Sequence, residues 1–311
     1  MSSMNNRTPP SSYGYNLVEA ARQPLVYSFS FAAILIVTTS ILNFNVLYRR
    51  VLRSSACAYY FMAAIPPILI YVLVSPINLI LQYGFQFIIQ DSPIMCRVIP
   101  FFIYTAPLWY GLMLVCASID RFFSSSESIR LRRLSQVYVA RRIILIVWII
   151  STIYMCPFLI IYYYDSGDPG NRRCLQYSTT LVAAYLMSRV ILYYILIPIM
   201  LSIFGVWTIY NIRSQKHRVA PIIQASSHRR TEGQLARMMI IQVGVYLLFF
   251  TPSAITYIIV TLIPSMSTPY YITIRSITVV WQQGGFFISF FLYVFTGKIY
   301  RTELKKMIQC R

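Results

Sequence analysis

Seven long apolar runs, joined by short polar segments, restrict the fold of this sequence more than any other feature. They cover approximately residues 24–47, 56–85, 93–123, 139–163, 179–212, 235–263 and 269–295. A helix needs about 20 residues to cross the roughly 30 Å hydrocarbon core of a bilayer. The runs are continuously apolar, whereas the strands of a membrane barrel alternate between apolar and polar residues. We therefore predict an all-α membrane protein built as a seven-transmembrane helix bundle.

The composition agrees with a lipid environment. Of the 311 residues, 58% are hydrophobic and only 11% are charged, whereas soluble domains carry about 25% charged residues. The net charge of +19 is compatible with a nucleic-acid partner, but the basic residues form short clusters between the apolar runs. That distribution is typical of membrane topology. We expect membrane lipid as a partner and no nucleic acid.

The basic residues also predict how the chain is oriented. Twenty of the 27 Lys and Arg residues fall on the side that holds all three predicted inner loops, with the adjoining span ends, and the C-terminal tail. By the positive-inside rule this side is cytoplasmic, and seven spans then place the N-terminus outside. We expect a multi-pass plasma-membrane protein with an extracellular tail over 1–23, a bundle over 24–295, and a cytoplasmic amphipathic helix and tail over 296–311.

Residues 297–308 combine an apolar face with a basic face. This pattern predicts a short amphipathic C-terminal helix that lies on an anionic inner leaflet. Cys310 follows it and is a candidate for palmitoylation, although a terminal cysteine is as often unmodified. Asn6 begins an Asn-Arg-Thr glycosylation pattern, which the following proline can weaken.

Motif residues recur in order along the spans. Asp120-Arg121-Phe122 ends the third span, and Cys96 precedes Asp120 by 24 residues. The further positions are Trp148, Pro157, Pro198, Pro252 and Tyr293. With these residues the chain resembles a rhodopsin-like (class A) G-protein-coupled receptor over about residues 24–308. In that family the third helix ends in Asp-Arg-Tyr, so Phe122 replaces the tyrosine.

The resemblance implies a disulfide between Cys96 and Cys174, the latter in the loop before the fifth span. In the predicted topology both cysteines face the oxidising side, where a disulfide persists. The bridge would tie the second outer loop to the third helix as a lid over a pocket. The alternative is two unpaired cysteines.

Arg121 is the residue that the resemblance makes central to signalling. An arginine at a helix end often simply reaches the interface. Here Asp120 precedes it and Glu232 begins the sixth span, although the chain has only eight acidic residues. We predict that Arg121 pairs with both carboxylates at rest, and that breaking the pairs lets the sixth helix move and activate a heterotrimeric G protein. The resemblance assigns Phe122 and Tyr293 to the same coupling region.

Several positions depart from the family. The second span has no acid where the family places one, so we do not expect the interior sodium site of the family. Ser289 and Phe290 replace the Asn and Pro of the seventh-helix motif, and Phe250 replaces a tryptophan of the sixth helix. These departures keep open the alternative of a receptor-like membrane protein without G-protein signalling.

The outer halves of the spans indicate the kind of ligand. The third span lacks the outer acid that amine receptors need, and the seventh lacks the lysine that retinal requires. The predicted pocket residues are aromatic, basic or amide-bearing, namely Tyr104, Arg189, Phe250, Tyr257, Arg275 and Gln283. Basic groups without nearby acids suggest a ligand with an anionic or acceptor-rich part. We expect a peptide, of the kind bound by invertebrate neuropeptide (FMRFamide-like) receptors.

Other function classes fit the sequence less well. The two histidines, His217 and His228, both fall in the third inner loop, and no catalytic or metal-binding set can be assembled at membrane depth. We therefore expect neither enzyme activity nor a cofactor. A transporter or channel usually places ionisable groups within its spans, and these spans are nearly free of them.

Overall fold

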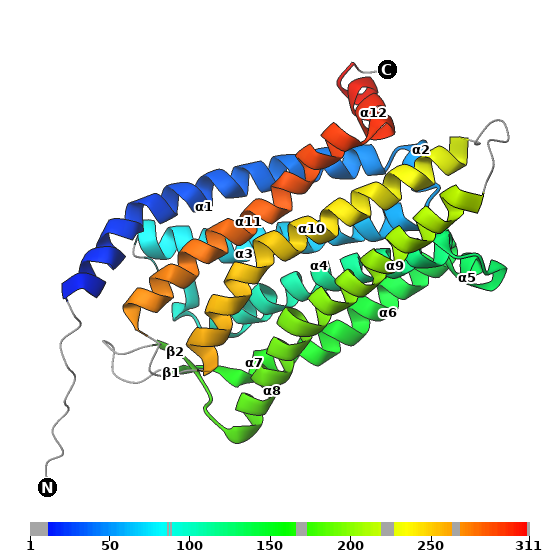
Figure 1. Ribbon diagram of the computed structural model, residues 1–311. Helices are drawn as coiled ribbons and strands as arrows, with labels where there is room; N and C mark the ends of the chain where they lie inside the picture. The colour runs from blue at the N-terminus through cyan, green and yellow to red at the C-terminus, as the bar shows by residue number, and fades with distance from the viewer. Residues whose placement is uncertain are drawn as a thin grey trace, which may run out of the picture.

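A computed structural model of the chain describes residues 12–85, 87, 89–165, 173–218, 227–262 and 268–309. Its long helices run side by side as one bundle (Figure 1). They are α1 (Ser12–Leu47), α3 (Ala56–Phe85), α4 (Met95–Ser125), α6 (Val137–Met155), α9 (Ile197–Arg218), α10 (Ser227–Leu262) and α11 (Pro269–Thr296). Shorter elements are α2 (Arg50–Arg53), η1 (Ile89–Asp91), α5 (Ile129–Leu134), α7 (Phe158–Ile161), α8 (Thr180–Val190), η2 (Ile191–Leu196), α12 (Lys298–Ile308), β1 (Tyr162–Asp165) and β2 (Arg173–Gln176).

Seven helical segments among the described residues are long and apolar enough to cross a membrane. They are Ala20–Leu47, Ala56–Phe85, Met95–Ser125, Val137–Ile161, Thr180–Ile212, Arg237–Val260 and Thr273–Phe295. Apolar side chains also cover their outer surface, as Leu145 and Ile153 of α6 illustrate with exposed fractions of 59% and 66%. Lipid is the solvent that accommodates such a surface. The predicted seven-transmembrane bundle is confirmed.

Several helix boundaries differ from the expected spans. Helix α1 begins at Ser12, so it includes part of the segment 1–23 that we expected as a tail. The fourth span ends at Ile161, where the chain turns into β1. The fifth span is divided, because the π-helical turn η2 separates α8 from α9 next to Pro198. Proline lacks the amide hydrogen that an α-helix uses at that position, and the π-turn accommodates the altered hydrogen bonding.

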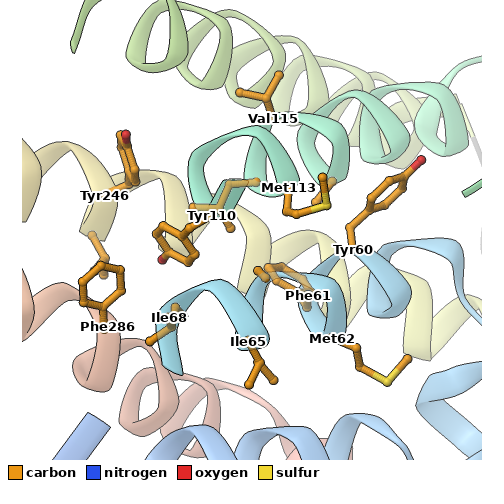
Figure 2. Close-up of a cluster of buried hydrophobic side chains, with 14 of the residues drawn as sticks. Tyr60, Phe61, Met62, Ile65, Ile68, Tyr110, Met113, Val115, Tyr246 and Phe286 are labelled. Atoms are coloured by element: carbon orange, nitrogen blue, oxygen red, sulfur yellow. The ribbon is translucent and has the colours of Figure 1, made fainter. Parts of the chain in front are cut away.

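The core lies where α3 and α4 meet α10 and α11. Figure 2 shows Tyr110 of α4 among side chains of the other three helices. Its ring centroid lies 5.1 Å from that of Phe286 on α11 and 6.0 Å from that of Phe250 on α10. Aromatic pairs at such separations add to the stability that burial alone provides. The core therefore joins the helices that carry the predicted switch residues.

Helix α12 packs its apolar face against the bundle. Tyr300 is fully buried, contacts Phe290 of α11 and donates a hydrogen bond of 3.0 Å to Asn43 Oδ1 of α1. Burial raises the pKa of the Tyr300 phenol, so its hydroxyl stays protonated and able to donate. The basic residues Lys298, Arg301 and Lys305 remain exposed. The amphipathic helix is present, but the bundle covers part of the face that we assigned to lipid. Asn6 and Cys310 lie outside the described residues.

Gly284 allows α10 and α11 to approach closely. A Cβ atom at Gly284 would lie 2.7 Å from Cε1 of Phe249, inside van der Waals contact. We expect Gly284→Ala to destabilise the folded protein by about 1–3 kcal/mol, the usual cost of overpacking. The measurement is the thermal unfolding midpoint of the purified protein in lipid nanodiscs.

Gly244→Ala is the matched control on α10. A Cβ atom there meets nothing within 4 Å, and alanine favours a helix over glycine by up to about 1 kcal/mol. The midpoint should stay the same or rise in this control. An unchanged midpoint in Gly284→Ala would contradict the close approach.

Candidate functional site

The candidate site residues fall into groups along the length of the bundle. We call the end that carries the disulfide, β1 and β2 the disulfide end. We call the opposite end, with Arg121, α5 and α12, the arginine end; the two are separated by the length of the helices (Figure 1).

At the arginine end, Asp120 and Arg121 form a buried ion pair. Arg121 Nη2 lies 2.6 Å from Asp120 Oδ2, and the two side chains are 2% and 4% exposed. A buried pair is stable only when further hydrogen bonds satisfy its charged groups. Ser135 Oγ donates to Asp120 Oδ1 at 2.7 Å, and Arg121 Nη2 donates to Ser55 Oγ at 3.3 Å. The pair therefore links α4 to the beginning of α3 and to the end of α5.

Of the other predicted switch residues, the structure describes the side chain of Phe122 but not that of Glu232. Phe122 packs on α9, with its ring centroid 5.8 Å from that of Phe204 and 5.4 Å from that of Trp207. Glu232 belongs to α10, but its side chain lies outside the described part of the structure. The contact between Glu232 and Arg121 stays a prediction.

Midway along the bundle, Gln242 joins three helices through its amide. Its Nε2 donates to Tyr110 Oη of α4 at 2.6 Å, and its Oε1 accepts a hydrogen bond from Tyr293 Oη of α11. The three side chains are at most 4% exposed. Unpaired polar groups are costly in such an interior, whereas a satisfied network holds its members in one arrangement. Tyr293, which we predicted to take part in switching, is thus bonded to a residue of the sixth span.

A cavity of about 390 Å³ lies nearer the disulfide end. Its described lining comes from the helical elements α3, η1, α4, α8, η2, α10 and α11. Polar lining residues include Ser75, Asn78, Gln82, Gln90, Ser253, Ser276 and Gln282. The volume suits part of a ligand of drug or peptide size.

Four of the six predicted pocket residues meet at this cavity. Tyr104, Arg189, Tyr257 and Arg275 all line it. The guanidinium carbon of Arg189 lies 4.4 Å from the ring centroid of Tyr104 and 4.8 Å from that of Tyr257. That of Arg275 lies 4.7 Å from the Tyr257 ring. Cation–π contacts of this kind hold both guanidinium groups beside the cavity.

The other two predicted pocket residues do not line this cavity. Phe250 lies deeper, with its ring stacked on Tyr246 at a centroid distance of 4.2 Å. Gln283 is fully buried, and neither its amide oxygen nor its nitrogen has a hydrogen-bond partner among the described residues. Its neighbour Gln282 lines the cavity instead, because successive helical residues point about 100° apart.

The predicted disulfide is present between Cys96 and Cys174, with Cα atoms 5.4 Å apart. Cys96 opens α4, and Cys174 lies in β2 opposite Tyr164 of β1. The bridge therefore ties the β1–β2 hairpin to the beginning of α4. The described cavity lining comes from other elements, so the predicted role of this loop as a lid stays a prediction.

Sequence reasoning missed several residues of these groups. Gln242 carries a detectable signal, because a lone amide within an apolar span needs a partner. Ser55 and Ser135 carry no such signal, since serines are common at helix ends. Within the described residues, no group of three or more His, Cys, Asp or Glu side chains is placed to hold a metal ion.

Comparison with known proteins identifies the family. A family model described as "7 transmembrane receptor (rhodopsin family)" matches residues 40–282. The match covers more than half of the 311 residues, and the chain belongs to this family. A search of curated proteins found no match.

Membership confirms the resemblance that the sequence motifs indicated. With its seven apolar helices, the chain is a multi-pass membrane protein. Members of this family are signalling receptors and not enzymes, which confirms the prediction that the protein is no enzyme.

Proposed function

We propose that this receptor binds an extracellular peptide at the disulfide end and activates a heterotrimeric G protein at the arginine end. The observation that carries the proposal is the polar cavity lined by Tyr104, Arg189, Tyr257 and Arg275. A peptide supplies both the acceptors and the aromatic surface that such a lining can bind. The neuropeptide subtype suggested by the sequence belongs to this proposal.

The proposed orientation places the N-terminus outside the cell and α12 in the cytoplasm. The supporting feature is the excess of Lys and Arg on one side of the spans. An epitope tag before residue 12 should therefore bind antibody on intact, unpermeabilised cells. Staining only after permeabilisation would show the opposite orientation and refute the assignment of 1–23 as extracellular.

Activation in this proposal proceeds by movement of α10. In the described conformation Arg121 is paired with Asp120, which corresponds to the closed form of the predicted switch. Release of Arg121, and of its predicted contact with Glu232, frees the cytoplasmic end of α10 to swing outward. A ligand achieves this only by binding the open form more tightly than the closed form.

A receptor-like protein without G-protein signalling is the second candidate. The observation that favours it is the Tyr110–Gln242–Tyr293 chain, which fixes three helices to one another in the interior. If no ligand or substitution releases these bonds, the bundle stays in one conformation and does not signal.

A peptide screen in cells that express the receptor with a promiscuous G protein tests the proposed function. We expect at least one neuropeptide to produce a response that Arg275→Gln abolishes at equal surface expression. Arg97→Gln removes an exposed arginine at the same end and is the matched control. A response that Arg275→Gln leaves unaltered would remove Arg275 from the site.

A further inference from the structure

We infer that the ligand presents a carboxylate to Arg189 and Arg275 in the cavity. The inference rests on the proposed receptor function and specifies the chemical group that the site recognises. It goes beyond a generally polar ligand, because it assigns one anionic group to two named guanidinium groups.

Arg189 is the stronger of the two anchors. Its side chain is only 3% exposed, and its Nη2 donates to the hydroxyl of Tyr257. Its Nε is buried and has no hydrogen-bond partner among the described residues. A buried donor without a partner carries a desolvation cost that a bound acceptor removes. A guanidinium N–H group donates a strong, charge-assisted hydrogen bond to a carboxylate.

Arg275 brings a second cation to the same place. The guanidinium carbons of Arg189 and Arg275 lie 4.8 Å and 4.7 Å from the centroid of one ring, that of Tyr257. Arg189 is held in position by aromatic faces, with Tyr104 and Phe158 at 4.4 Å and 5.9 Å. Such contacts orient a cation but do not neutralise it.

Among the described lining residues, no acidic side chain balances the charge of the two arginines. The described cavity lining contains two arginines and no Asp or Glu. Two ion pairs, Asp120 with Arg121 and Glu303 with Lys306, lie at the arginine end and not at the cavity. Because isolated charges are costly in a low-dielectric interior, an anionic ligand group is the favourable complement.

The inference discriminates between kinds of peptide. A free C-terminal carboxylate or an acidic side chain would offset one of the two positive charges, while the amides Asn78 and Gln82 of the lining can bind peptide groups. A peptide that ends in Arg-Phe-amide would bring another cation and no terminal carboxylate. The cavity therefore favours an acidic peptide over an amidated basic one, and in this respect the inference departs from the FMRFamide-like subtype that the sequence suggested.

Matched small probes test this directly on the full-length receptor in neutral-lipid nanodiscs. The probes are N-acetyl-Ala-Phe as the free acid, the same dipeptide as its C-terminal amide, and oleate as a lipid acid. The thermal unfolding midpoint, titrated against each probe, yields apparent dissociation constants. We expect the free acid to bind at least about tenfold more tightly than the amide, as expected for a charge-assisted hydrogen bond.

Substitutions then assign the effect to the two arginines. Arg189→Gln and, separately, Arg275→Gln should remove the preference for the acid, whereas Arg97→Gln, on an exposed residue outside the cavity lining, should keep it. Arg275 is only half-buried, so its variant provides the test even if Arg189→Gln fails to fold.

Each outcome has a defined meaning. Equal binding of acid and amide, no binding of either carboxylate probe, or a preference that survives Arg275→Gln overturns the inference. Arginine-dependent binding of oleate alone upholds the carboxylate and assigns it to a lipid acid in place of a peptide. G-protein activation plays no part in these titrations, so failure of the receptor function would leave their result unchanged.

Discussion

Replacing Gln242 by Leu is expected to raise ligand-independent signalling. The substitution removes the hydrogen bonds that join Gln242 to Tyr110 and Tyr293 and leaves both tyrosine hydroxyls without those partners in the interior. Each bond contributes about 0.5–1.5 kcal/mol to the conformation in which it forms. That conformation is the one with Arg121 bound to Asp120. Loss of the two hydrogen bonds should therefore shift the equilibrium from this closed form towards the open form by roughly 5- to 150-fold.

The measurement is basal G-protein signalling, normalised to the amount of receptor at the cell surface. Gln283→Leu is the matched control, because this buried glutamine has no hydrogen-bond partner for its amide among the described residues. The control should leave basal signalling unchanged, and removing its unpaired polar group should not destabilise the protein. Basal signalling that stays the same or falls in Gln242→Leu would refute a restraining role for the network.

Loss of the Cys96–Cys174 disulfide is expected to have the largest effect on stability. The bridge closes a segment with a sequence separation of 78, and removing a native disulfide typically costs about 2–5 kcal/mol. Helices already inserted in a bilayer restrict the unfolded chain, so the lower part of this range is expected. Cys174→Ser should lower the thermal unfolding midpoint in nanodiscs and weaken ligand binding by releasing the β1–β2 hairpin from α4.

Cys156→Ser is the control for this prediction, since Cys156 is an exposed free thiol. The wild-type protein treated with a reductant should behave like Cys174→Ser, whereas the reductant should not change the Cys174→Ser midpoint further. If the midpoints of wild type and Cys174→Ser coincide, the disulfide contributes nothing to stability.

The fold was predictable because the bilayer imposes a simple physical requirement on the sequence. Every spanning segment must be apolar and must satisfy its backbone internally, so α3 was expected at 56–85 and is found as Ala56–Phe85. The division of the fifth span was not predicted. Pro198 signals a disturbance, but whether the chain kinks or forms the π-turn η2 depends on the packing of neighbouring helices.

Site residues were predictable from the sequence only where the residue type is unusual for its position in a membrane span. Arg189 and Arg275 stand out in the sequence because cations are rare within membrane spans, and both line the cavity. The sequence predicted Gln283 in the pocket, whereas Gln282 lines the cavity, since a sequence pattern without packing partners does not fix the rotation of a helix. The pairing of Ser135 with Asp120 depends on how the segment after α4 folds back, which no local pattern specifies.

The most direct test of the account uses the purified receptor in nanodiscs with a heterotrimeric G protein and measures guanine-nucleotide exchange. Gln242→Leu should accelerate exchange without any ligand, and the double variant Gln242→Leu/Arg121→Ala should return it to the rate of the G protein alone. The control is the double variant Gln242→Leu/Arg130→Ala, in which the second substitution affects an exposed residue of α5. This control should retain the accelerated exchange. Exchange that none of these receptors accelerates, or acceleration that survives the loss of Arg121, would contradict the claim that the bundle signals through its arginine end.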